Sequence, residues 1–310
     1  MNKKYVYAAL AFMIIGSLIL SGCAKGTKHK LNSPHKLTIT TTLYPLEYFT
    51  ERIGGKHVSV SNVVPPGTDA HSFEPSTKDM IKISDSDAFI YNGTGIEGFA
   101  DKVNETVKKE GVKTVKAAEG LTLEKTEHHD EVHDEHGDKD PHIWLDPVYS
   151  IQMAKNIEKA LIDLNPKAKS DFQKNYRSLR KDLKRLDESF HLTVNESPNK
   201  EIIVSHAAYG YWEHRYGLKQ IPVSGLSTSQ EPSQKQLRAL IKHAKAKHIR
   251  YVLLENSASD KVARVVEKET GAKTLKLRNL ETLSPKDAEA DEDYLSLMQK
   301  NVQVIKQALQ

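Results

Sequence analysis

Apolar residues in this chain fall into short β-branched runs that alternate with amphipathic stretches, and the alternation occurs in two series. The first series predicts strands at 37–43, 58–64 and 88–91, with helices at 46–53 and 77–83. The second predicts strands at 201–204, 220–223, 251–254 and 273–277, with helices at 233–247 and 261–270. Strands interleaved with helices are typical of parallel sheets. The pattern therefore predicts an α/β protein with two lobes.

Two of the predicted helices begin with capping signals. Ser76 can cap the helix at 77–83 while Asp79, three residues on, reaches back to the backbone. Asp146 precedes Pro147, and proline is well suited to a first helical turn. Both signals predict where a loop gives way to a helix.

A long helix is predicted between the two series. Residues 147 to about 194 are poor in glycine and are interrupted by Asn165-Pro166. After this break, large apolar residues recur every three or four positions and form one stripe: Phe172, Tyr176, Leu179, Leu183, Leu186 and Phe190. A helix of about 25 residues spans roughly 37 Å at 1.5 Å per residue. We expect it to join the lobes stiffly.

The N-terminus has the pattern of an export signal. Lys3 and Lys4 precede an apolar run at 5–20 that is shorter than the roughly 20 residues of a membrane-spanning helix. Small residues at its end predict cleavage after residue 22. Leu20-Ser21-Gly22-Cys23 resembles a lipobox, which predicts that Cys23 is lipidated. The alternative is a chance cysteine after an ordinary signal peptide, although an unpaired thiol would be a liability on an exported protein.

Charge and composition limit the possible functions and indicate where the folded lobes begin. Loss of residues 1–22 removes two lysines from the 45 Lys plus Arg, which leaves a net charge of +2 against 41 Asp plus Glu. Such a balance argues against nucleic-acid binding. Residues 23–36 are polar and basic, as expected of a tether near an anionic membrane. We expect an N-terminal lobe at 37–165, the linking helix at 166–194 and a C-terminal lobe at 195–310.

Three of the 14 histidines lie where a predicted strand ends or a helix begins. His71 lies in the loop before the capped helix, His142 lies between two prolines before the next helix, and His206 directly follows strand 201–204. Ligands bind at this edge of open α/β sheets, so the lobes could bring these imidazoles to one cleft. A loop histidine is nevertheless more often simply solvated. No local metal motif is present, since 71 and 64 residues separate the three in turn.

Six motifs occur in order along the chain: Thr-Thr-Leu-Tyr-Pro (41–45), His-Ser-Phe-Glu-Pro (71–75), Asp-Pro-His-Ile-Trp-Leu-Asp-Pro (140–147), Ser-His-Ala-Ala-Tyr-Gly-Tyr (205–211), Gly-Leu-Ser-Thr-Ser-Gln-Glu-Pro-Ser (225–233) and Leu-Arg-Asn-Leu-Glu (277–281). Together they resemble the zinc and manganese substrate-binding lipoproteins of ABC importers, the ZnuA/AdcA-like group. The resemblance implies two α/β lobes joined by a long rigid helix, with the metal in the cleft between them. It implies His71, His142, His206 and Glu281 as ligands. Without it, Glu281 would be taken for a solvated acid.

The implied ligand set favours Zn(II). Zinc prefers tetrahedral sites of imidazole nitrogen and carboxylate oxygen, whereas manganese prefers more oxygen ligands. Manganese-selective proteins of the resembled group have a carboxylate where His206 stands. Mn(II) remains the alternative. Asp140 and Glu255 are candidates to orient the imidazoles.

The segment 124–139 combines seven acids and two lysines with four histidines: His128, His129, His133 and His136. Its composition predicts a disordered, exposed loop. It is either a solvated insertion or an auxiliary zinc collector beside His142, and zinc members of the resembled group commonly have such a loop.

The resemblance implies an extracytoplasmic, lipid-anchored receptor that delivers zinc to a membrane permease and its ATPase. We expect it to act as a monomer and not as an enzyme. A secreted zinc hydrolase is the contrasting hypothesis, but four protein ligands would leave no open position for water. An added adhesin role is a third possibility, for which nothing in the sequence argues.

Overall fold

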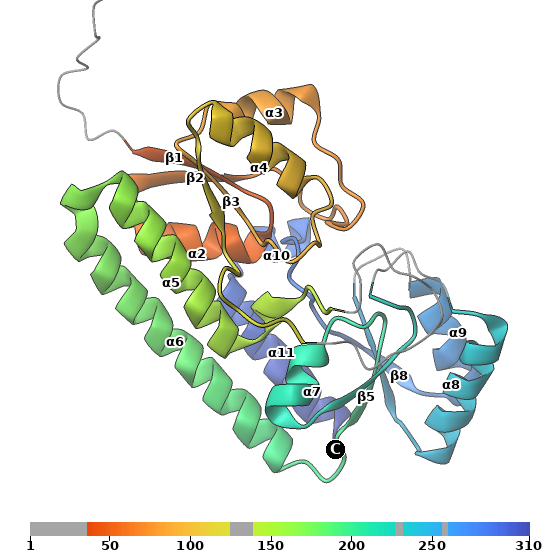
Figure 1. Cartoon of the computed structure of the whole chain (residues 1–310). Coiled ribbons are helices and arrows are strands. Elements are labelled where there is room, and N and C mark those ends of the chain that lie inside the picture. The colour runs from red at the N-terminus through yellow and green to blue at the C-terminus, as the bar shows by residue number, and fades with distance from the viewer. Residues whose placement is uncertain (1–35, 125–138, 227–231, 256–259) are drawn as a thin grey trace, which may run out of the picture. The chain divides into compact units, whose positions relative to one another are not determined.

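The computed structural model describes residues 36–124, 139–226, 232–255 and 260–310 (Figure 1). It contains two four-stranded parallel sheets, in the strand orders β2-β1-β3-β4 and β6-β5-β7-β8. The first sheet comprises β1 (Leu37–Thr41), β2 (Val58–Asn62), β3 (Ala88–Tyr91) and β4 (Lys113–Lys116). The second comprises β5 (Glu201–Val204), β6 (Lys219–Pro222), β7 (Tyr251–Leu254) and β8 (Lys273–Lys276). The predicted α/β fold with two parallel-sheet lobes is confirmed.

Helices connect the strands of each sheet and flank them. The first lobe has α2 (Tyr44–Gly54), α3 (Thr77–Ser84) and α4 (Ala100–Lys109). The second has α7 (Gly210–Tyr216), α8 (Gln234–Ala246), α9 (Asp260–Thr270) and α10 (Pro285–Glu289). The remaining α-helices of the described ranges are α5 (Pro147–Leu164), α6 (Lys169–Asn195) and α11 (Tyr294–Ala308). None of the helices in these ranges has both the length and the apolar character needed to cross a membrane.

Both predicted caps are present. The Ser76 hydroxyl accepts a hydrogen bond from the backbone N–H of Asp79, and the Asp79 carboxylate accepts one from the backbone N–H of Ser76. Asp146 accepts hydrogen bonds from the backbone N–H groups of Val148 and Tyr149 at the start of α5. The second cap matters for the site, because it ends the segment that carries His142.

The long helix α6 runs beside both lobes (Figure 1). It has 27 residues and packs against α2 and α5 of the first half of the chain and against α7 and α11 of the second half. Its predicted stripe is buried apart from Tyr176, which is partly buried. The apolar spacing therefore located both the helix and its buried face.

The last helix, α11, was not predicted, although it joins the two lobes. The ring of Tyr294 lies 4.9 Å from that of Phe49 and 5.7 Å from that of Tyr48, both on α2. Its hydroxyl donates to the backbone carbonyl of Trp144 at 2.6 Å. Apolar residues of both lobes consequently share one core cluster. The residue boundaries that we predict for the lobes stay a prediction.

Two leucines of α6 test the role of its buried stripe. Leu183 is 0% exposed and Leu192 is 62% exposed. Leu183→Ala should lower the free energy of unfolding by about 2–5 kcal/mol, because it leaves a cavity. Leu192→Ala should change it by less than about 0.5 kcal/mol. Urea unfolding followed by circular dichroism measures both; equal losses would contradict this packing.

Candidate metal centre

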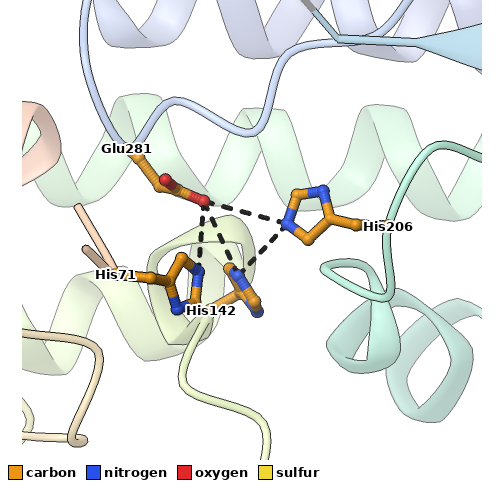
Figure 2. Close-up of side chains that lie close together, drawn as sticks. All are labelled: His71, His142, His206 and Glu281. Carbon is orange, nitrogen blue, oxygen red and sulfur yellow. Dashed lines mark hydrogen bonds and ion pairs between the residues drawn. The ribbon is translucent and has the colours of Figure 1, made fainter. Parts of the chain in front are cut away.

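Four side chains from segments that are distant in the sequence lie close together (Figure 2). His71 comes from the loop between β2 and α3, and His142 from the segment between β4 and α5. His206 follows β5, and Glu281 lies between β8 and α10. Each segment leaves the carboxyl end of a strand, where an open parallel sheet binds ligands. One candidate ligand atom from each residue lies within 4.8 Å of the others.

One oxygen of Glu281 faces all three imidazoles. Glu281 Oε1 lies 3.7 Å from the Nε2 atoms of His71 and His142 and 3.8 Å from Nε2 of His206. The Nε2 atoms of His142 and His206 are 3.4 Å apart. In a tetrahedron with metal–ligand bonds of 2.0–2.1 Å, ligand atoms lie about 3.3–3.4 Å apart. These four distances exceed the tetrahedral separation by at most about 0.5 Å, so small movements of the side chains would let them surround a four-coordinate ion.

Two carboxylates fix the orientation of two imidazoles. Asp140 Oδ1 lies 2.8 Å from His142 Nδ1 and accepts the backbone N–H of His142 at 2.9 Å. Glu255 Oε2 lies 2.9 Å from His206 Nδ1, and its other oxygen accepts the hydroxyl of Tyr209 at 2.8 Å. The contact with Asp140 leaves Nε2 of His142 to face the centre, as metal-binding histidines require. Asp140 and Glu255 thus lie beside the imidazoles that they were predicted to orient, and their effect on metal binding stays a prediction.

Helix α7 holds the segment that carries His142. The hydroxyl of Tyr211 donates to the carbonyl of Asp140, and the indole of Trp212 donates to the carbonyl of Leu145, both at 2.8 Å. At Gly210 a Cβ atom would lie 2.6 Å from Asp140 Oδ2, so only glycine permits this approach. Arg215 also pairs with Asp146. These contacts were not predicted from the sequence. The dense run of aromatic residues after His206 was the signal that could have indicated them.

Burial and neighbouring charges have opposite effects on the pKa values of His142 and Glu281. His142 and His206 are 0% exposed and Glu281 is 4% exposed. Burial alone would lower the pKa of His142, but Asp140 and Glu281 outweigh it and raise this pKa to about 9. Burial would raise the pKa of Glu281, yet hydrogen bonds and charge from the surrounding histidines hold it well below its usual range. The carboxylate is therefore ionised at neutral pH.

The other histidines of the described residues do not join this group. His191, His214 and His243 lie near single acids elsewhere, and the nearest of these contacts is 3.0 Å, from His243 Nε2 to Glu201. Cys23 and the four histidines of the loop lie outside the described residues. In the part of the chain that the structure describes, no further cluster of His, Cys, Asp or Glu has metal-binding geometry.

Comparison with known proteins places the chain in a family. The family model described as "Zinc-uptake complex component A periplasmic" matches residues 39–308. The chain belongs to the ZnuA family. Among curated members, it is 34% identical to the high-affinity zinc uptake system protein ZnuA of Bacillus subtilis, with 94% of each chain covered.

A second relative is a longer protein. The chain is 35% identical to the zinc-binding lipoprotein AdcA of Streptococcus pneumoniae over 94% of its own length, but it spans only 60% of AdcA. The crystal structure of the Zn(II)-bound ZnuA-like domain of that AdcA matches with a TM-score of 0.76 at 36% identity. The match covers 88% of this chain and 99% of that domain. The ZnuA-like fold is thus shared, and AdcA has further sequence beyond it.

In this ZnuA-family chain, Asp140→Asn should lower the pKa of the His142 imidazole from about 9. The amide removes the negative charge beside Nδ1, so the imidazolium loses stabilisation. NMR titration of the metal-free protein measures the change. Asp171→Asn is the matched control, since Asp171 lies 2.8 Å from His57 Nε2, in an Asp–His pair separate from the four side chains. An unchanged pKa of His142 in Asp140→Asn would refute the assigned cause.

Proposed function

We propose that this chain is the extracytoplasmic substrate-binding protein of an ABC importer for zinc. It binds one Zn(II) ion through His71, His142, His206 and Glu281 and delivers the ion to a membrane permease. The observation that carries this proposal is the set of four buried candidate ligand atoms, with Glu281 Oε1 within 3.8 Å of all three imidazoles.

The donor set favours zinc over manganese. Three imidazole nitrogens and one carboxylate oxygen are typical zinc ligands, whereas manganese sites are richer in oxygen. The Zn(II)-bound AdcA domain, which shares this fold, supports the same choice. Mn(II) is the alternative substrate.

The same geometry favours a receptor over a zinc hydrolase. A catalytic zinc keeps one position open for water and has a general base nearby. Here all four tetrahedral positions have a protein donor, and Glu281 Oε1 faces the three imidazoles. Zinc is therefore the cargo, and the protein has no enzymatic role.

Location and partners follow from the N-terminus and the family. Cleavage after residue 22 and lipidation of Cys23 would anchor the protein to the outer face of the cell membrane, with 23–36 as the tether. Its partners are the permease and its ATPase, and it acts as a monomer. His128, His129, His133 and His136 serve as auxiliary collectors of zinc.

Metal content after competition tests the function. The exported form of the chain, exposed to equal zinc and manganese and then desalted, should retain one zinc per chain by mass spectrometry of the elements. Retention of manganese in preference would overturn the choice of zinc. Retention of neither metal would overturn the proposal that the protein is a metal receptor.

Histidine substitutions test the ligands. His71→Ala, His142→Ala and His206→Ala should each weaken zinc binding by at least about 100-fold in competition with a chelator, since each removes one of four donors. His243→Ala is the matched control, because its imidazole pairs with Glu201 and not with the centre. Its affinity should equal that of the unmodified protein. Equal losses in all four variants would refute the assigned ligands.

A further inference from the structure

Asn279 contacts the candidate carboxylate ligand at two points. Its side-chain Nδ2 donates to Glu281 Oε1 at 2.8 Å, and its Oδ1 accepts the backbone N–H of Glu281 at 3.3 Å. The second contact is an Asx turn, in which an asparagine oxygen holds the backbone two residues on. Both the amide nitrogen and the amide oxygen thus have chemically matched partners, which sets the orientation of the amide.

The oxygen that Asn279 holds is the oxygen that faces the three imidazoles (Figure 2). A carboxylate that binds a metal through both oxygens must bring them to similar distances. For Glu281, a rotation that brought Oε2 to a similar distance would also move Oε1 relative to Asn279 and disturb their 2.8 Å hydrogen bond. The contact therefore favours coordination through Oε1 alone.

Asn279 also links Glu281 to two of the candidate histidine ligands. Its Nδ2 donates to Glu255 Oε2 at 3.0 Å, the oxygen that lies 2.9 Å from His206 Nδ1. The backbone carbonyl of Asn279 accepts the indole N–H of Trp144 at 2.7 Å. Trp144 lies two residues after His142. The amide lies between two carboxylates and offers a hydrogen to each. It consequently reduces their mutual repulsion while it fixes their positions.

The backbone after Asn279 is held in an unusual conformation. Leu280 has a φ of 61°, in the left-handed region that favours glycine. Its side chain is buried in the shared core, and the carbonyl of Glu281 accepts the backbone N–H of Tyr44. A strained residue beside a functional group indicates that its surroundings determine the local geometry. Here that geometry brings Asn279 Nδ2 and Glu281 Oε1 together.

We propose that Asn279 is a positioning residue that restricts Glu281 to one coordinating oxygen and thereby favours four-coordinate zinc over manganese. The inference rests on the zinc-receptor function proposed above. Manganese accepts more oxygen ligands and higher coordination numbers, so a second oxygen from Glu281 would benefit manganese more than zinc.

The test compares Asn279→Ala with the unmodified protein. Substitution of a residue that orients a metal ligand typically costs 10–100-fold in metal affinity. We expect zinc binding to weaken within about that range and manganese binding to weaken less, so that the ratio of the manganese dissociation constant to the zinc dissociation constant falls by up to about 100-fold. Chelator competition measures both constants.

Cobalt(II) in place of zinc reports the coordination number directly. Tetrahedral cobalt(II) absorbs strongly in the visible range, whereas five- and six-coordinate cobalt(II) absorbs weakly. We expect strong bands in the unmodified protein and weaker bands in Asn279→Ala. If Asn279 had a merely structural role, Asn279→Ala would weaken the binding of zinc and manganese equally and leave the cobalt(II) spectrum unchanged.

Asn156→Ala is the matched control. Asn156 is another half-buried asparagine, and its Nδ2 also donates twice, to the carbonyls of Ala117 at 2.9 Å and Glu119 at 3.0 Å. It belongs to α5, and both of its partners lie in the segment that follows β4. Its zinc-to-manganese ratio and cobalt spectrum should match those of the unmodified protein.

A second variant guards against misfolding of Asn279→Ala. Asn279→Leu keeps roughly the size and branching of the side chain but has no hydrogen to donate to either carboxylate and adds no charge beside them, so it should lower the same ratio. If the variants fold and keep the metal-affinity ratio and the cobalt(II) spectrum of the unmodified protein, the inference is overturned while the proposed zinc-receptor function stands. If the unmodified protein itself fails to hold zinc, the proposed function fails first.

Discussion

The buried carboxylate of Glu281 is the constraint on which the rest of the structure depends. An ionised carboxylate loses much of its solvation when it leaves water, and it remains charged only where donors and cationic partners replace that water. Here three imidazoles and the amide of Asn279 surround it. Both lobes must supply these partners, so the two lobes have to be held in a fixed position relative to each other.

The shared core meets this requirement. The helices α6 and α11 pack against elements of both lobes, and α7 fixes the segment that carries His142 through Tyr211 and Trp212. Tyr294 stacks on Tyr48 of α2 and donates a hydrogen bond to the backbone carbonyl of Trp144. The candidate ligands are therefore positioned by packing far from the centre as well as by their own hydrogen bonds. For a four-coordinate ion, such positioning determines which metal suits the cavity.

The sequence predicted the sheets well, because buried parallel strands are short apolar runs that end at turn residues. It also placed the three histidines at strand ends. It missed α4 and β4, whose buried residues are few and lie among lysines, and α7, which has only seven residues. Glu281 was found through the six motifs and not through its local pattern. Asn279 carried no signal, since its role depends on Glu255 and Trp144, which are remote in sequence.

The contact between α11 and α2 connects residues near the end of the chain with residues near the start of the fold. For a chain that is exported N-terminus first, as proposed here, α2 emerges long before its partner. The core shared by the two lobes is then completed only after translocation has reached the last helix.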